Sequence, residues 1–187
     1  MIKNMFLTAL LVLTVSGFAH AQAAKNEDLE YKLLATIKTS TMQKEIDQVS
    51  ARGYRILVGS PTSGSEMAVF MKREGTVEAP FKYKLLATTR TATMQKELNQ
   101  MAADGYRLIP STMIAKEQLF GGIEIVMILE RPPVLTKRYE YKLLATSLTS
   151  TLQKEVTQSQ TDGFRIVGMV SRGEHMVVME RETDFKE

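Results

Sequence analysis

Cysteine is absent from this sequence of 187 residues, and histidine occurs only twice, at His20 and His175. No disulfide can form, so stability must come from packing, and a lipid-modified cysteine near the N-terminus is excluded. One or two histidines cannot build a His cluster, and no Ser-His-Asp triad can be assembled around His175, which we expect at the surface end of a strand. The pair Gly121-Gly122 lacks the lysine of a phosphate-binding loop. These absences argue against an enzyme, and the sequence predicts no catalytic residue.

The composition also gives no sign of a nucleic acid, a metal or a cofactor. The formal net charge of +3 is too small to predict a nucleic-acid partner. The 12 methionines recur at core-like positions, and without clustered His or Cys we interpret them as packing residues that fill gaps.

The N-terminal residues have the pattern of an export signal. Lys3 supplies a positive charge, residues 5–18 are apolar, and Ala19-His20-Ala21 has the small-x-small form of a cleavage site. We expect residues 1–21 to be a signal peptide, cleaved after Ala21 or after Ala23, and the mature protein to be periplasmic or secreted without a membrane span. A retained membrane anchor is the alternative, although the apolar run is shorter than the roughly 20 residues that a spanning helix needs.

The chain contains three copies of one sequence repeat. The hexapeptide Tyr-Lys-Leu-Leu-Ala-Thr occurs at residues 31–36, 83–88 and 141–146. The register continues without a gap through Gln-Lys-Glu triplets and then through glycine, an aromatic residue and arginine, which occupy 43–45 and 53–55, 95–97 and 105–107, and 153–155 and 163–165. Such spacing suits a small supersecondary unit. We place the repeats at 30–74, 82–131 and 140–182.

The first copy predicts a β-α-β-β unit. Residues 31–37 favour a strand with apolar side chains on both faces. Two threonines, Thr39 and Thr41, are candidate N-caps for an amphipathic helix with a stripe of Met42, Ile46 and Val49. Glycine at 53 ends this helix, and strands follow at 54–58 and 67–72.

The other copies repeat this plan with two differences. In the second copy, with strands expected at 106–109 and 125–129, a longer apolar connection precedes the last strand, and its candidate partner-contact residues are Met113, Ile114, Leu119 and Phe120. This loop either contacts a partner or subunit or folds back on its own core. In the third copy Ser159 interrupts the apolar stripe, so its helix should be the least tightly docked.

The three copies should share one core. A strand with two apolar faces must be covered on both, and the helix of one copy covers only one. We therefore predict an α+β fold, a pseudo-threefold domain with central sheets, which could close towards a barrel, and three helices outside. Separate repeats joined by linkers are the competing arrangement.

Each copy resembles a small bacterial β-α-β-β domain family of unknown function. The resemblance rests on the Tyr-Lys-hydrophobic strand, the amphipathic helix and the Gly-aromatic-x-hydrophobic pattern that follows it. Members of that family usually carry Gly-Trp-Glu where this chain has Gly-Tyr-Arg or Gly-Phe-Arg. The resemblance implies a fold for nearly the whole mature chain and no catalytic residue.

Charged residues recur at equivalent positions of the copies. If the copies surround an axis, six basic strand residues converge on an anion or an acidic surface: Lys32, Lys84, Lys142, Arg55, Arg107 and Arg165. The alternative is that they are solvated or form ion pairs. The recurring carboxylates are Glu45, Glu97 and Glu155, near helix N-termini, and Glu66, Glu124 and Glu174. For the first set the helix dipole is a sufficient reason.

The sequence therefore predicts an exported, non-enzymatic protein for macromolecular interaction or a structural role, with a protein partner or self-association. The alternative is a small anionic-ligand binder that uses the Lys/Arg set.

Overall fold

The structure, a computed structural model, describes residues 29–75, 79–118 and 121–183. The predicted signal peptide lies outside these residues. Unit 1 contains β1 (Tyr31–Thr36), α1 (Thr39–Ser50), β2 (Tyr54–Pro61) and β3 (Met67–Arg73). Unit 2 contains β4 (Lys82–Thr88), α2 (Thr91–Ala103), β5 (Arg107–Leu108), the 3-10 turn η2 (Pro110–Thr112), β6 (Ile114–Glu117) and β7 (Ile123–Arg131). Unit 3 contains β8 (Arg138–Thr146), α3 (Thr149–Thr161), β9 (Arg165–Ser171) and β10 (His175–Thr183).

Each unit forms its own antiparallel sheet with the last strand in the middle. The strand orders are β1-β3-β2, β4-β7-β5 with β6 also paired to β7, and β8-β10-β9. The prediction of an α+β fold built from three β-α-β-β units is thereby confirmed. Because the last strand pairs with both others, the first strand of every unit lies at a sheet edge.

The helices form where the apolar stripes predict them but do not begin as predicted. Met42, Ile46 and Val49 are buried along α1. The expected threonine N-caps are wrong, since the N-cap position of α1 is Lys38 and it makes no side-chain cap hydrogen bond. Instead Thr36, the last residue of β1, accepts a hydrogen bond at its Oγ1 from the Lys38 N–H, 3.2 Å away. The threonine thus shapes the turn before the helix, and Thr88 and Thr146 do the same in units 2 and 3.

Unit 2 departs most from the predicted plan. Its second strand has two residues only, because Pro110 has no N–H to continue a ladder and starts η2. The following segment, predicted as an apolar loop, contains the strand β6, which pairs with β7. The insertion therefore widens the sheet of unit 2 to four strands.

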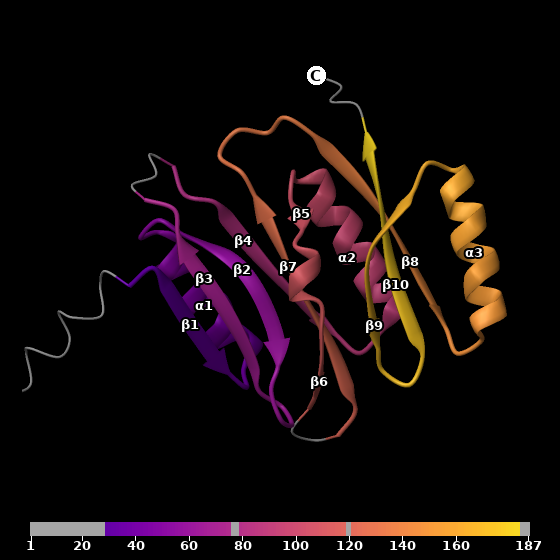
Figure 1. The fold of residues 1–187 in the computed structure, drawn as a ribbon, viewed down its shortest axis with the longest axis horizontal. Coiled ribbons are helices and arrows are strands. Elements are labelled where there is room, and N and C mark those ends of the chain that lie inside the picture. Colours follow the sequence, from indigo (N-terminus) through magenta and orange to yellow (C-terminus); the bar gives the residue numbers. More distant parts are fainter. Residues whose placement is uncertain (1–28, 76–78, 119–120, 184–187) are drawn as a thin grey trace, which may run out of the picture.

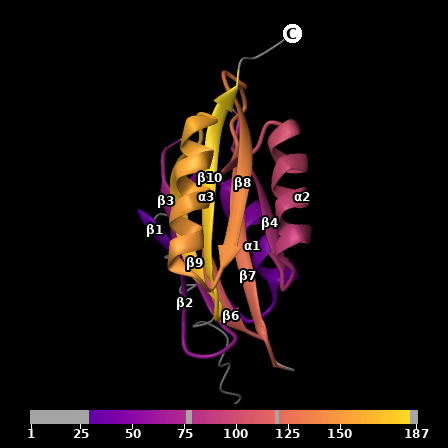
Figure 2. The same cartoon turned by 90° about the vertical axis from the view of Figure 1, so that its right-hand side faces the viewer.

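The units lie in a row in chain order, from β1 at the left of Figure 1 to α3 at the right. Figure 2 looks at the unit 3 end of this row, with α3 nearest the viewer. One core cluster joins unit 1 to Tyr83, Ile114, Val126 and Ile128 of unit 2. A second joins unit 2 to residues of unit 3, including Tyr141, Met176 and Val178. The third cluster contains residues of unit 3 alone, beneath α3.

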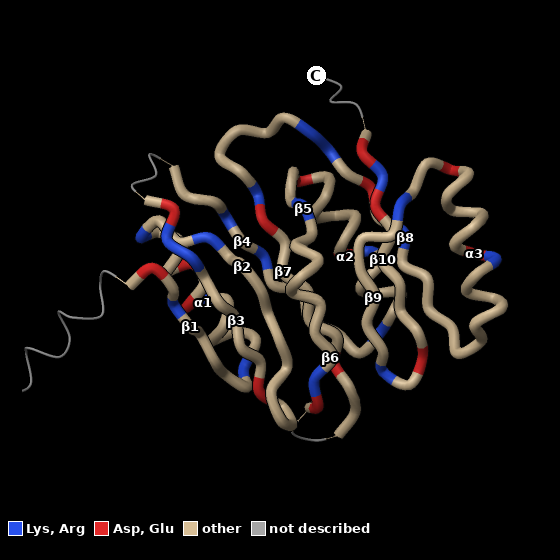
Figure 3. The backbone as a smooth tube through the Cα atoms, in the orientation of Figure 1, with Lys and Arg blue, Asp and Glu red and all other residues tan. Residues whose placement is uncertain are grey.

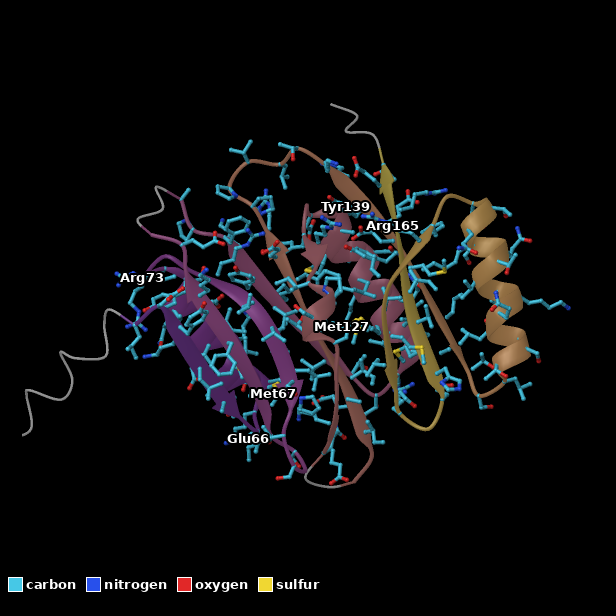
Figure 4. All side chains as sticks on the ribbon, viewed as in Figure 1. Glu66, Met67, Arg73, Met127, Tyr139 and Arg165 are labelled. Atoms are coloured by element: carbon cyan, nitrogen blue, oxygen red, sulfur yellow. The ribbon has the colours of Figure 1, made fainter. Side chains whose placement is uncertain are left out.

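The two faces of the middle sheet are therefore covered by different units. In the middle sheet, Val126 and Ile128 face unit 1, whereas Met127 and Leu129 belong to the cluster shared with unit 3. Met127 lies in the middle of the molecule in Figure 4. Methionine fills both shared clusters, which agrees with the packing role predicted for this residue type. Among the described residues, no helix is long and apolar enough to cross a membrane.

Candidate functional site

The junction between units 1 and 2 is made by a helix side chain that binds the edge of the next sheet. Gln43 on α1 accepts a hydrogen bond at Oε1 from the Leu85 N–H of β4, 2.7 Å away. Its Nε2 donates to the Tyr83 carbonyl oxygen at 3.2 Å. One amide side chain thereby satisfies a backbone donor and a backbone acceptor of an edge strand, as a neighbouring strand would.

The junction between units 2 and 3 repeats this contact. Gln95 on α2 accepts from the Leu143 N–H at 2.6 Å and donates to the Tyr141 carbonyl oxygen at 2.8 Å. In unit 3 the Nε2 of Gln153 donates instead to Thr157 Oγ1 on its own helix, 3.2 Å away. The first residue of the Gln-Lys-Glu triplet is therefore the docking residue. Its identity in all three copies was the sequence signal for this role.

The leading tyrosines complete the same two junctions. The Tyr83 hydroxyl accepts from the Ile56 N–H of unit 1 at 3.3 Å, and the Tyr141 hydroxyl accepts from the Leu108 N–H of unit 2 at 2.8 Å. Burial raises the pKa of both phenols, which keeps them neutral. Each tyrosine thus reaches across to the second strand of the preceding unit.

Two of the six residues of the predicted basic set form ion pairs between units. Arg55 binds both carboxylate oxygens of Glu130, at 3.1 and 2.7 Å, and stacks on Phe81. Arg107 binds Glu180 in the same way, at 3.1 and 2.9 Å. These hydrogen bonds raise the pKa of each arginine. Arg165 instead donates to Glu180 of its own sheet at 3.0 Å.

Glu180 is the most deeply buried charged residue of these ion pairs. Its side chain is 1% exposed and accepts from Arg107, Arg165 and the Tyr141 hydroxyl. Burial by itself would raise the pKa of this carboxyl group, but the hydrogen bonds from Arg107, Arg165 and Tyr141 outweigh it and the pKa is lowered. Glu180 is therefore ionised at neutral pH and fastens unit 3 to unit 2.

The lysines of the basic set stay in their own units and do not converge with the arginines. Lys142 pairs with Asp162 at 3.0 Å and lies over the Phe164 ring. Lys32 and Lys84 each line a groove beside the first strand of their unit. Figure 3 shows both signs of charge interspersed along the row, with no basic centre.

Two of the six predicted basic residues do meet at one cleft. Arg55 and Arg107 line a cavity of about 220 Å³ together with Phe81, Tyr139 and Lys137. Tyr139 and Arg165 are labelled in the upper part of the molecule in Figure 4. Glu130 also lines the cleft, so the positive charge there is partly balanced.

The recurring carboxylates near the hairpins have structural partners. Glu124 pairs with the buried Lys116 at 3.1 Å, Glu174 pairs with Arg172 at 3.3 Å, and Glu66, at a hairpin end in Figure 4, accepts from Thr62 at 2.8 Å. Within the described residues, no group of three or more His, Cys, Asp or Glu side chains is placed to hold a metal ion.

The predicted partner-contact residues that the structure describes pack against neighbouring units of the same chain. Ile114 is fully buried, and its Cδ1 would lie 3.2 Å from a Cβ at Gly59 of unit 1. Met113 fills the space beside Gly168 of unit 3, where a Cβ would clash with its sulfur. A larger residue at 168 would therefore have to displace the flexible end of the Met113 side chain. The insertion of unit 2 thus contacts both neighbours, while Leu119 and Phe120 lie outside the described residues.

The first sheet presents an apolar surface that its counterparts do not expose. We define the head face as Tyr31, Leu33, Val58 and Phe70, of which Leu33, Phe70 and Val58 are cross-strand neighbours in register. Tyr31 is 46% exposed, whereas the equivalent Tyr83 and Tyr141 are 4% and 3% exposed. The preceding unit makes this difference in units 2 and 3, and no such unit covers unit 1 among the described residues.

The last unit presents the opposite surface. We define the tail face as Gln153 of α3 together with Ile166 and Met169 of β9. Ile166 is 52% exposed, whereas its equivalents Ile56 and Leu108 are 7% and 2% exposed beneath the tyrosine of the following unit. The row therefore ends in two surfaces that elsewhere in the chain are covered by each other.

Comparison with known proteins supports a repeat and assigns no family to the whole chain. A family model described as "Polyglycine hydrolase-like, structural repeat" matches residues 90–110. This short segment runs from the turn before α2 through β5 to the start of η2. Comparisons with curated proteins and with solved structures give no match.

Proposed function

We propose that this chain is an exported, non-enzymatic interaction module that binds another protein through its head face. The observation that carries this proposal is the exposure of Tyr31, Leu33, Val58 and Phe70 on one side of one sheet. Soluble proteins seldom leave contiguous apolar patches uncovered, and such patches commonly mark binding surfaces. Single exposed apolar residues would not support the same inference.

The edge of the same sheet adds polar groups to this surface. β1 pairs only with β3, so its other side is a sheet edge. The Leu33 N–H and the Tyr31 carbonyl correspond to the atoms of Leu85 and Tyr83 that Gln43 binds. A sheet edge beside an apolar face favours a protein partner over a small molecule, since backbone groups are recognised by strands or amides.

A photo-crosslinking experiment tests this function in the producing cells. A benzophenone amino acid replaces Leu33 in one variant, and Lys154, on the solvent side of α3, in a control variant. We expect protein adducts from position 33 and none from position 154 after irradiation. If position 33 gives no protein adduct while the variant accumulates normally, the head face does not bind protein in these cells.

A small-anion site is a second proposal, supported by the cleft where Arg55 and Arg107 meet. Paired arginines with an aromatic wall can bind an anion such as sulfate or a carboxylate. Titration with sodium sulfate, with sodium chloride at equal ionic strength as control, is expected to raise the melting temperature of the wild type and not of Arg107→Gln. Equal shifts in both proteins would contradict this site.

A further inference from the structure

The groove beside β1 lacks a wall that the equivalent groove of unit 2 has. In unit 2, Lys84, Leu85, Leu86, Ala87 and Glu97 line one side of a groove whose other side is Thr39, Ser40 and Gln43 of α1. In unit 1, the equivalent Lys32, Leu33, Leu34, Ala35 and Glu45 line a groove of about 340 Å³. The other residues that line it are Gln48 and Val49 of α1 and Arg52, which follows that helix. The wall that the helix of a preceding unit makes in unit 2 is therefore missing here.

The chain carries a second copy of that missing wall at its other end. α3 begins Thr-Ser-Thr-Leu-Gln-Lys-Glu, and α1 begins Thr-Ser-Thr-Met-Gln-Lys-Glu. Thr149, Ser150 and Gln153 are therefore identical to the three α1 residues that line the groove of unit 2. The strand is identical as well, since β1 and β4 share the hexapeptide Tyr-Lys-Leu-Leu-Ala-Thr.

Both halves of an established interface are thus exposed at opposite ends of one molecule. We propose that the protein partner of the head face is a second copy of this chain, which docks its tail face there. Gln153 of one copy then bonds the Leu33 N–H and the Tyr31 carbonyl of the next, as Gln43 and Gln95 do within the chain. The Tyr31 hydroxyl lies against the second strand of the other copy, as Tyr83 and Tyr141 do. This inference rests on the proposed function of the head face and names its partner.

The charge that faces the arginine of the preceding unit differs between the internal junctions and this external one. Glu130 and Glu180, which bind the arginine of the preceding unit, are replaced in unit 1 by Lys72, as the registers Tyr31↔Lys72, Tyr83↔Glu130 and Tyr141↔Glu180 show. In the external junction Lys72 meets Arg165 instead of a carboxylate, and like charges at an interface weaken binding. Lys72 therefore keeps the contact between copies weak and reversible, while the internal junctions stay closed.

The contact is head-to-tail, so an open assembly keeps one unoccupied head face and one unoccupied tail face. A heterologous contact of this kind produces rings or open chains rather than a closed twofold dimer. The expected species are dimers, trimers and longer chains that grow with protein concentration.

Sedimentation velocity of the purified mature chain over a wide concentration range tests the proposal through two substitutions. Lys72→Glu restores the carboxylate of the internal junctions, and we expect it to lower the dissociation constant of self-association about tenfold or more. Gln153→Leu, added to Lys72→Glu, is expected to reverse that gain. Lys154→Gln is the control, because the equivalent Lys44 and Lys96 are exposed in the internal junctions, and it should change nothing. A Lys72→Glu variant as monomeric as the wild type at every concentration would overturn the proposal.

The absence of cysteine from the chain allows a test of which surfaces meet. Leu33→Cys and Gln153→Cys are made as separate proteins, each also carrying Lys72→Glu, and are joined by a short bismaleimide. We expect a crosslinked dimer when the two are mixed and much less from either alone. Equal crosslinking within the Leu33→Cys protein alone would indicate a twofold contact and overturn the head-to-tail arrangement.

These results separate the inference from the proposed function. Adducts from position 33 in cells to a different protein, without crosslinks between Leu33→Cys and Gln153→Cys, would leave the head face as a binding surface and remove the second copy as its partner. If both experiments fail, the proposed function fails with the inference.

Discussion

The two inner junctions and the two ends of the row are built from the same residues in different surroundings. Tyr83 and Tyr141 are buried and hydrogen-bonded, whereas Tyr31, which starts the same hexapeptide, is nearly half exposed. Likewise Gln43 and Gln95 bind a neighbouring strand, whereas Gln153 turns back to its own helix. The comparison teaches that the neighbouring unit, and not the local sequence, determines whether these side chains carry stability.

The largest expected effect follows from removing the neighbours of unit 1. A fragment of residues 30–74 loses Tyr83, Ile114, Val126 and Ile128 from its core cluster, and each such side chain stabilises by roughly 1.5–3 kcal/mol when buried. We expect this fragment to show no cooperative thermal transition by circular dichroism. A fragment of residues 30–131 is expected to show one. A sharp melt of the single unit would mean that the units do not depend on one another.

Glu180→Gln should be the most damaging single change in the row of ion pairs. It removes the negative charge that Arg107 and Arg165 share, and we expect a loss of about 3 kcal/mol at neutral pH by urea denaturation. Glu182→Gln is the matched control, because its pair with Lys137 is solvent-exposed and such pairs contribute about 0–1 kcal/mol.

The role of Glu180 also predicts how the free energy of unfolding depends on pH. Because the pKa of Glu180 is lowered in the folded state, the unfolded chain takes up a proton first as the pH falls. The contribution of Glu180 is then fully present above the unfolded-state pKa and is lost as the pH falls through the folded-state pKa. The free energy of unfolding of the wild type should therefore fall more steeply with acidification than that of Glu180→Gln. Parallel curves for the two proteins would contradict this role.

A smaller difference is expected between two tyrosines of the same hexapeptide. Tyr141→Phe removes the acceptor of the Leu108 N–H and a donor to Glu180, and we expect a loss of about 1–3 kcal/mol because a buried donor is left unpaired. Tyr31→Phe, on the head face, should stay within about 0.5 kcal/mol of the wild type. Thermal denaturation at low protein concentration measures both. Equal losses would show that the exposure of Tyr31 makes no difference to its contribution.

The smallest effect belongs to the docking glutamines. Gln95→Leu removes two hydrogen bonds to β8, and since the strand edge can then bind water we expect a loss of about 1 kcal/mol. Gln153→Leu is expected to leave the stability of the monomer unchanged within about 0.5 kcal/mol. A comparable loss from Gln153→Leu would indicate that its bond to Thr157 stabilises α3 as much as docking stabilises α2.

Sequence periodicity sufficed for the units because their signals are local. The stripe of Met42, Ile46 and Val49 and the glycine at 53, whose φ of 84° is left-handed, act within one helix and one turn. The helix starts were missed because several threonines compete at each start, and the one that forms a hydrogen bond with the turn ends the preceding strand. The strand β6 was missed because its four residues show little periodicity of their own. The strand forms through its pairing with β7, which is a contact between segments.

The candidate site could be predicted only in its residue types. The recurrence of Arg55, Arg107 and Arg165 was visible, and ion pairing was one of the two expectations for them. Their actual partners lie mostly in the following unit, and no spacing in the sequence encodes that Glu130 faces Arg55. The recurrence of Gln43 in the copies signalled a role, but its partner strand was out of reach, because that contact depends on the distance between a helix of one unit and an edge of the next.

The shared clusters also set an order for synthesis. The core of unit 1 is complete only when Val126 and Ile128, on the last strand of unit 2, are in place. When only the first β-α-β-β segment has been synthesised, its apolar inner face therefore lacks the residues of unit 2 that cover it. The core of unit 1 can therefore close only after most of unit 2 has been synthesised, whereas the third cluster contains residues of unit 3 alone.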